Sequence, residues 1–130
     1  MQMFPRDEIW IRKVYEPEIM GGKLTRLFKP ENRMYPNPKG FKIGEEIKIR
    51  VVEVPCHDNQ ECVPVLSKEY KKAFIKNLAV IDIDMLKKKD FLGASKDITD
   101  IASLRYHLGI LYNRAPGSFK KITIIDIKYI

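Results

Sequence analysis

Two stretches of the chain alternate apolar and polar residues with a period of two, and this pattern constrains the fold more than any other feature. Residues 47–54 read IKIRVVEV, and residues 122–130 read ITIIDIKYI. Because successive side chains of a strand point to opposite faces, both stretches predict strands with one buried face. In the first stretch the alternation slips at Val52, which indicates a bulge or increasing burial. In the second stretch we expect three side chains to face inward and two outward, namely Ile125, Ile127 and Tyr129 against Asp126 and Lys128.

Shorter apolar runs predict the remaining strands. We expect strands at 9–14 and 26–28, and a central strand at 78–83 that is apolar on both faces. Residues 29–43 contain three prolines and a glycine, so we expect an irregular loop there. Residues 55–72 are polar and interrupted by proline, and they predict a long excursion between strands.

One segment predicts a regular helix. Apolar residues at 101, 104, 108 and 111 recur at helical spacing, and Thr99 or Asp100 is a candidate N-cap. We therefore expect a helix over about 99–112. A shorter helical turn is expected from about Pro17, ending at Gly21-Gly22, because adjacent glycines favour a left-handed termination.

Together these elements predict one α+β domain over residues 1–130. A chain of 130 residues with 45% hydrophobic content is long enough to bury a core without disulfides or metals. Five or six strands, one main helix and short helical turns, joined by long loops, indicate a small, partly open β-barrel.

Positive charge gathers in the segment 21–42. This segment holds six basic residues against one acidic residue, Glu31, so it carries a net +5 of the chain's formal +7. A local imbalance of this size predicts a surface for an anion, and phosphate is the commonest large anionic partner of a basic domain. A solvated, lysine-rich surface that binds nothing is the alternative interpretation.

Two cysteines, Cys56 and Cys62, bracket the polar sequence HDNQE. A tetrahedral zinc site needs four ligands, and two cysteines with the neighbouring His57 leave it incomplete. We therefore predict no metal site and no cofactor. A disulfide and two free thiols both remain open for this pair.

The order of these features resembles that of the ASCH domain, a family in the PUA-like superfamily of small β-barrels. A helical turn ending in glycine is followed by the Lys-Thr-Arg cluster within 23–26, a proline-rich loop and the turn Lys-Ile-Gly-Glu at 42–45. An Asp-Phe pair at 90–91 then precedes a helix that ends near Tyr112, and an aliphatic strand closes the chain. The resemblance runs from about Trp10 to Ile130, and 55–77 is its least matched part.

The hallmark of that family is usually written Gly-x-Lys-x-x-Thr-x-Arg. Gly21 and Lys23 fit it, whereas the threonine and arginine positions hold Arg26 and Phe28, and Thr25 lies one residue early. The resemblance implies a cleft between barrel and helices, lined by this cluster, that binds RNA or nucleosides. We expect a positive-φ glycine or a bulge near 22–25, so that Lys23 and Arg26 project into one cleft.

An RNA-binding module is accordingly the first functional hypothesis. Lysine supplies a point charge for phosphate, arginine supplies a fork, and an exposed aromatic ring stacks on an unpaired base. The predicted nucleic-acid contacts are Lys23, Arg26, Lys29, Arg33, Tyr35 and Lys39, with Phe41 as a second candidate ring.

An enzyme is the second hypothesis. Some ASCH members resemble amidohydrolases that remove an acetyl group from modified cytidine, using a lysine, a threonine and a carboxylate. In this chain the roles would fall to Lys23, Thr25 and Asp90. Asp82 and Asp84 are other candidates for the carboxylate. His57 is a weak candidate for a catalytic role, and His107 is expected to be structural or exposed rather than a general base.

The expected partner is RNA or a nucleoside, with an acidic protein as a third possibility. No apolar run reaches the length that spans a bilayer, and the N-terminal MQMFPRD lacks the order of charges and apolar residues seen in signal peptides. We therefore expect a cytoplasmic protein with no membrane partner. Composition says nothing about the oligomeric state.

Overall fold

The computed structural model describes residues 8–34, 40–54 and 65–130. Two α-helices and five strands make up most of this part of the chain. In chain order they are β1 (Glu8–Arg12), α1 (Glu16–Met20), β2 (Arg26–Pro30), β3 (Glu46–Val54), β4 (Val65–Asp82), α2 (Ile101–Tyr112) and β5 (Lys121–Tyr129). Four 3-10 turns join them, namely η1 (Lys13–Tyr15), η2 (Ile83–Met85), η3 (Lys88–Phe91) and η4 (Pro116–Ser118).

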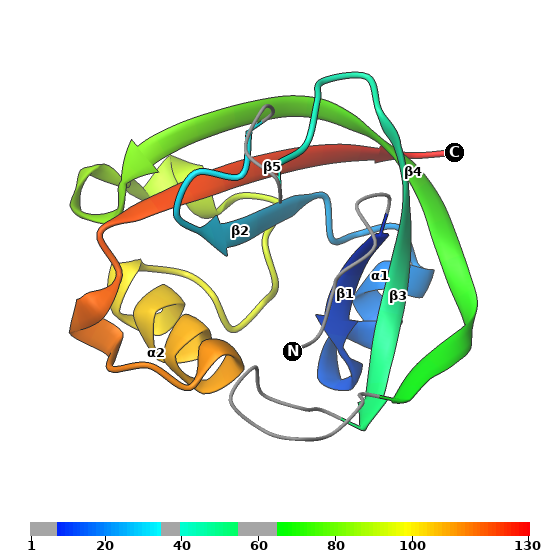
Figure 1. Ribbon diagram of the computed structural model, residues 1–130, viewed down its shortest axis with the longest axis horizontal. Helices are drawn as coiled ribbons and strands as arrows, with labels where there is room; N and C mark the ends of the chain where they lie inside the picture. Colours follow the sequence, from blue (N-terminus) through cyan, green and yellow to red (C-terminus); the bar gives the residue numbers. More distant parts are fainter. Residues whose placement is uncertain (1–7, 35–39, 55–64) are drawn as a thin grey trace.

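The strands form one mixed sheet in the order β1-β3-β4-β5-β2. β1 runs parallel to β3, and the other neighbouring strands are antiparallel. β4 arches across the molecule, pairing with β3 through its first half and with β5 through its second half (Figure 1). Register shifts on both sides of β4 increase the bending, as bulges do. The fold is therefore a small α+β structure with a partly open barrel, as the sequence predicts.

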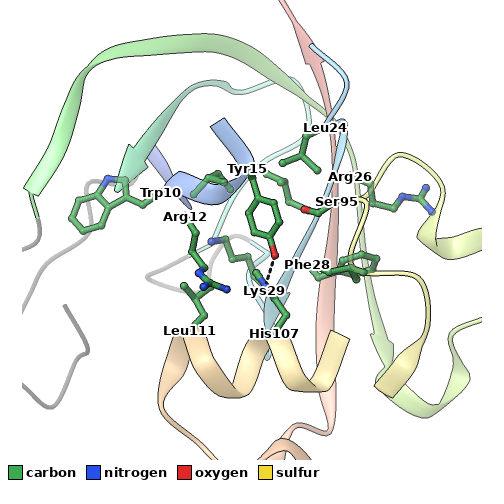
Figure 2. A pocket seen from close by; sticks show the side chains of 13 residues that line it. Trp10, Arg12, Tyr15, Leu24, Arg26, Phe28, Lys29, Ser95, His107 and Leu111 are labelled. Atoms are coloured by element: carbon green, nitrogen blue, oxygen red, sulfur yellow. Dashed lines mark hydrogen bonds between the residues drawn. The ribbon is translucent and has the colours of Figure 1, made fainter. Parts of the chain in front are cut away.

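The predicted helix over 99–112 is confirmed as α2. Asp100 caps its N-terminus, because its carboxylate accepts a hydrogen bond from the Ser103 amide at 2.7 Å. The helix ends at Asn113, which adopts the left-handed conformation. At the other end of the chain, η1 turns the backbone after β1 so that Tyr15 points toward α2 (Figure 2).

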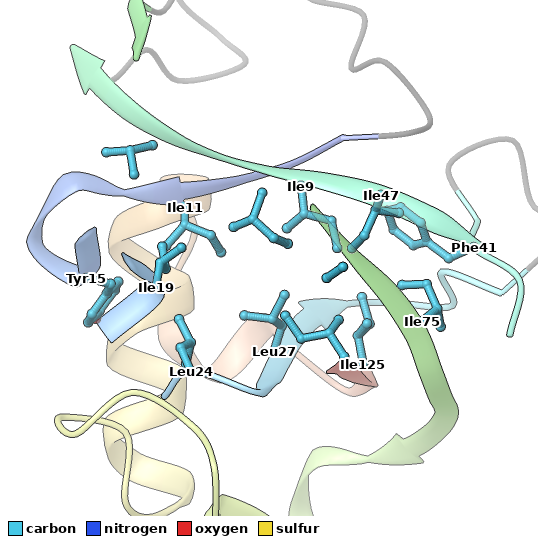
Figure 3. Close-up of a cluster of buried hydrophobic side chains, with 14 of the residues drawn as sticks. Ile9, Ile11, Tyr15, Ile19, Leu24, Leu27, Phe41, Ile47, Ile75 and Ile125 are labelled. Carbon is cyan, nitrogen blue, oxygen red and sulfur yellow. The ribbon is translucent and has the colours of Figure 1, made fainter. Parts of the chain in front are cut away.

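Buried apolar residues form two cores. The first fills the inside of the curled sheet and includes Ile9, Ile19, Leu27, Ile49 and Ile125 (Figure 3). The second lies beneath α2 and includes Phe28, Leu104, Leu108, Ile122 and Ile124. Alternate residues of β2 and β5 belong to different cores, so these two strands are buried on both faces.

The side chains of residues 122–130 can be compared with the alternation predicted for this strand. Ile125 and Ile127 face inward, as predicted, and Tyr129 packs against the same core. Ile122 and Ile124 are buried as well, on the opposite face of the strand beneath α2. The alternation of apolar and polar residues did not predict this second buried face. Thr123 is buried between these two isoleucines and donates a hydrogen bond to the Glu31 carbonyl at 2.7 Å.

Two segments fold more regularly than predicted. Lys29 and Pro30 belong to β2 rather than to the loop expected at 29–43, because β5 pairs with them. Residues 65–72 belong to β4 rather than to a polar excursion, since β3 pairs with most of them. Between β4 and α2, the turn η3 is held by the Asp90 carboxylate, which accepts a hydrogen bond from the Lys87 amide at 2.7 Å.

The turn between α1 and β2 contains the glycine conformation expected there. Gly22 has φ 68°, a value that favours glycine over residues with a Cβ. Beyond this turn the backbone amides of Thr25 and Arg26 both donate to the Gly93 carbonyl, at 2.9 and 3.0 Å. The segment after η3 is thereby held against the start of β2.

Among the glycines whose surroundings the structure describes, Gly93 tolerates a side chain least. It has φ 82°, and a Cβ there would lie 2.6 Å from Thr25 Oγ1. We expect Gly93→Ala to lower the free energy of unfolding by about 2 to 5 kcal/mol, through strain and overlap together. Chemical denaturation of the variant measures this effect.

Two other glycines separate strain from overlap. Gly44 has φ 87° with no atom near its Cβ position, so Gly44→Ala should cost only about 1 to 2 kcal/mol. Gly117 has neither feature, so Gly117→Ala should change stability by less than about 0.5 kcal/mol. Equal losses at Gly93 and Gly44 would contradict the proposed overlap with Thr25.

Candidate functional site

A narrow cleft lies where the two edge strands of the sheet, β1 and β2, approach α2 (Figure 2). Its walls come from β1, η1, β2, the segment 95–98 and α2. The cavity volume is about 30 Å³, which is room for roughly two water molecules. A ligand larger than this must place one group inside the cleft and leave the remainder at its mouth.

Two cationic side chains line this cleft from opposite edges of the sheet. Arg12 is the last residue of β1, and Lys29 lies in β2. Both side chains extend into the space between Tyr15 and α2 (Figure 2). Within the described ranges, neither Arg12 nor Lys29 has a carboxylate partner in an ion pair or hydrogen bond. The cleft therefore holds two cationic side chains that form no ion pair with a described carboxylate.

The environment of Lys29 disfavours its charge. Part of the residue reaches the surface, but its amine lies deep enough that desolvation lowers its pKa to about 8. Repulsion from Arg33 acts in the same direction. An anion beside the amine would reverse both effects, since it stabilises the protonated form.

Tyr15 links the cleft to α2 through hydrogen bonds. Its hydroxyl donates to Asp97 Oδ2 at 2.8 Å and lies 2.9 Å from His107 Nδ1. A hydroxyl has one proton, so a Tyr15 that donates to Asp97 accepts from His107, whose Nδ1 then carries the proton. Nε2 of the same ring is left as an acceptor. Burial raises the pKa of Tyr15, and the bond to Asp97 adds to this rise.

His107 is neutral near pH 7. Burial lowers its pKa to about 4, and repulsion from Arg12 contributes further. The imidazole and the Tyr15 ring are tilted by 55° with their centroids 5.5 Å apart. His107 is thus a fixed polar wall of the cleft, carried by α2, and adds no positive charge of its own.

Arg26 lines the cleft but its guanidinium is engaged elsewhere. Nε and one terminal nitrogen donate to the two carboxylate oxygens of Asp126, at 2.6 and 3.0 Å. The other terminal nitrogen donates to the Asp90 carbonyl at 3.0 Å. The hydrogen bond with Asp126 raises the pKa of Arg26. Arg26 therefore ties β2 to β5 and to η3, and its fork has little left to offer a ligand.

The other residues predicted for catalysis lie outside the cleft walls. Lys23 is exposed on the turn before β2 and does not line the cleft. Thr25 is half-buried with its hydroxyl against Gly93, and the Asp90 carboxylate holds the amide of Lys87. Lys23, Thr25 and Asp90 are thus not among the residues that the cleft brings together.

The predicted nucleic-acid contacts are spread more widely than one cleft. Lys29 lies inside it, whereas Arg33 is half-buried and its side-chain Nε donates to the Pro30 carbonyl at 2.9 Å. Phe41 is buried in the first core, which removes it as a stacking ring. Two further predicted contacts, Tyr35 and Lys39, lie outside the described residues. The cysteine pair Cys56 and Cys62, with His57 between them, also lies outside the described residues.

The remaining carboxylate candidates are on the surface. Asp82 and Asp84 are exposed, and Asp84 forms an ion pair with Arg105 at 3.1 Å. Neither lines the cleft.

The sequence did not indicate that three residues, Arg12, Tyr15 and His107, would line one cleft. Arg12, Tyr15 and His107 are separated by up to 95 positions, and no local pattern joins the first two to α2. The sequence feature that could have pointed to the cleft is the position of His107, which lies on the predicted helix next to its apolar face. The prediction that His107 has a structural role agrees with its hydrogen bond to Tyr15.

Comparison with known proteins supports the fold and goes no further. No family model and no curated protein matches the chain. A solved structure described as "Crystal structure of hypothetical protein PH0355" is similar to it over 95% of this chain and 97% of that one. The TM-score is 0.57 and the sequence identity 15%. This likeness shows a shared small, curled sheet, while membership of the ASCH family stays a prediction.

Within the part of the chain that the structure describes, no helix combines the length and apolar character needed to cross a membrane.

Proposed function

We propose that this protein is an RNA-binding module of the ASCH type, in which the cleft beside α2 receives a phosphate of the RNA. The observation that carries the proposal is the meeting of Arg12 and Lys29 in a narrow cleft, with no carboxylate partner among the described residues. The barrel-like fold fits a PUA-like module. The formal charge of +7 favours an anionic partner.

The chemistry of the two cations suits a phosphate group. Arginine offers a planar fork and lysine a compact charge, so together they can hold one phosphate from two sides. The negative charge of a bound phosphate would also offset the desolvation that lowers the pKa of Lys29, because it stabilises the protonated amine. The exposed Lys23, at the turn before β2, is proposed as an outer phosphate contact.

Two broader expectations belong to the same proposal. Residues 1–130 are proposed to form a single domain, since β2 and β5 contribute to both cores and would couple their folding. A cytoplasmic location is proposed as well.

Removing either cleft cation should weaken RNA binding. For Lys29→Met we expect a loss of roughly tenfold in affinity, corresponding to about 1.4 kcal/mol, and a similar loss for Arg12→Met. Fluorescence anisotropy with a labelled oligouridine of about 12 nucleotides, at two salt concentrations, measures this. Each variant should also reduce the salt dependence by about one phosphate contact.

Lys120→Met is the matched control, since Lys120 is exposed and lies outside the cleft. An equal loss for this variant would show that charge alone governs binding. Absence of wild-type binding at low salt, or an affinity indifferent to salt, would end the RNA-binding proposal.

Binding should also depend on pH through Lys29. An anion binds the protonated amine, whose pKa in the free protein is about 8. Affinity should therefore be highest below pH 8 and fall as the pH rises to 9, well before ordinary lysines near 10.5 lose their charge. Lys29→Arg keeps its charge over this range, so its affinity should stay level. A wild-type affinity that is constant between pH 7 and 9 would contradict a role for Lys29.

An amidohydrolase acting on acylated cytidine is the second candidate. It is favoured by the depressed pKa of Lys29, because an amine that is partly neutral near pH 8 can take a proton from an attacking water. Water would add to the acyl carbon, the carbon–nitrogen bond would break, and the exocyclic amine would leave with a proton. Chromatography of acetylated cytidine incubated with the protein detects the released cytidine.

The variants separate the two lysines in that reaction. Loss of turnover in Lys29→Met but not in Lys23→Ala would place the base in the cleft, whereas the reverse would favour the role of Lys23 implied by the family resemblance. A flat time course for the wild type would remove the enzyme hypothesis and leave the RNA-binding proposal in place.

A further inference from the structure

The outer face of the sheet carries a second group of cationic and aromatic side chains, remote from Lys29. On β3 and β4 the side chains that alternate with the buried ones point outward. The inner set includes Ile47, Ile49, Ala73 and Ile75, all buried in the first core. The outer set includes Glu46, which lies opposite Phe74. Its cationic and aromatic members, called here the outer-face stripe, are Lys48 and Arg50 on β3, Tyr70, Lys72 and Phe74 on β4, and Lys128 on β5.

Strand register brings the members of the stripe together in rows. Arg50 pairs with Tyr70, and Lys48 pairs with Lys72. Phe74 pairs with Lys128 on its other side. Each aromatic ring of the stripe therefore has a cationic residue as its direct cross-strand neighbour.

The two rings are available to a ligand. Tyr70 and Phe74 are each 44% exposed. Lys48 Nζ lies 5.3 Å from the centroid of the Tyr70 ring, so the cation already sits beside the aromatic surface. The cores beneath this sheet and beneath α2 involve neither ring.

The charge pattern of the central row offers folding little net gain. Like charges placed directly opposite each other on neighbouring strands are destabilising, and Lys48 and Lys72 are so placed, although Glu8 lies opposite Lys48 on its other side. A single exposed aromatic residue needs no explanation. Two rings on one face of one strand, with a lysine between them and cations on both flanking strands, form a mixed surface that a ligand can use.

We propose that the outer-face stripe binds single-stranded nucleic acid. Unpaired bases would stack on Tyr70 and Phe74, while Lys48, Lys72 and Lys128 contact phosphates. The rise of about 3.3 Å per residue separates the two rings by about 13 Å along β4, with Lys72 between them. A sheet face with interleaved rings and cations suits a strand whose bases and phosphates alternate in the same way.

Charge complementarity favours this occupant over other partners. The stripe contains four cationic residues, and the acidic side chains beside it are Glu46, which pairs with Phe74, and Glu8, which lies 3.6 Å from Arg50. Glu8 is also the direct cross-strand partner of Lys48, so the row Glu8–Lys48–Lys72 combines two lysines with one carboxylate. Four cations against these two carboxylates still leave an excess of positive charge on this face. The inference is separate from the cleft and holds even if Arg12 and Lys29 bind no RNA.

The test uses the full chain and a labelled oligouridine of about 12 nucleotides at low salt. Tyr70→Ala combined with Phe74→Ala should reduce affinity at least tenfold, because both stacking surfaces are removed. Tyr106→Ala is the matched control, since Tyr106 is 67% exposed on α2 and should leave affinity unchanged. Lys72→Glu should weaken binding more than Lys120→Glu. Circular dichroism and the melting temperature show whether each variant keeps the fold.

The outcomes separate this inference from the function proposed for the cleft. Weak RNA binding by the Tyr70/Phe74 variant, together with normal binding by Arg12→Met and Lys29→Met, supports the stripe and rules out the cleft as the binding site. The opposite pattern overturns the role of the stripe and leaves that of the cleft in place. No binding by the wild type overturns both. Two further results would overturn the stripe as a nucleic-acid surface: equal affinity for a duplex, or a wild-type dimer on size-exclusion chromatography that the Tyr70/Phe74 variant abolishes.

Discussion

The burial of β5 on both faces is the constraint on which the other features of the structure depend. Ile125 and Ile127 belong to the core inside the curled sheet, and Ile122 and Ile124 to the core beneath α2. Hydrogen bonds to β4 on one side and β2 on the other satisfy its backbone. One strand therefore joins the barrel to the helix, and apolar burial on its two faces supplies the main driving force for both packings.

The cleft follows from the way the barrel stays open. β1 and β2 are the two edges of the sheet, and neither hydrogen-bonds to the other. η1 and α2 fill part of the gap through the contacts of Tyr15 with Asp97 and His107. Arg12 and Lys29 occupy the space that remains. The gap between the two edge strands thus creates a partly desolvated space that could hold an anion. The Arg26–Asp126 ion pair holds β2, one wall of this space, against β5.

The outer face and the cleft use cations in different ways. In the cleft, desolvation makes the charge of Lys29 costly, which favours a single tightly held anionic group. On the outer face Lys72 and Lys128 are exposed and lie near exposed rings, which would favour an extended ligand with many weak contacts. A chain with both surfaces is suited to a ligand that is both polyanionic and rich in planar groups.

Local pattern alone determined the strand at 47–54, the last strand and the helix capped by Asp100, because side-chain periodicity and capping depend only on neighbouring residues. It also located the glycine turn at Gly22. Tertiary structure decided the rest. Lys29 was assigned to a loop because Pro30 follows it, yet pairing with β5 makes both part of a strand. Arg12, Tyr15 and His107 meet only because the sheet curls, and sequence spacing carries no record of contacts made across so many residues. Arg26, conversely, was predicted from the sequence to contact a ligand. The pairing of β2 with β5 places it beside Asp126, and the sequence does not predict this ion pair.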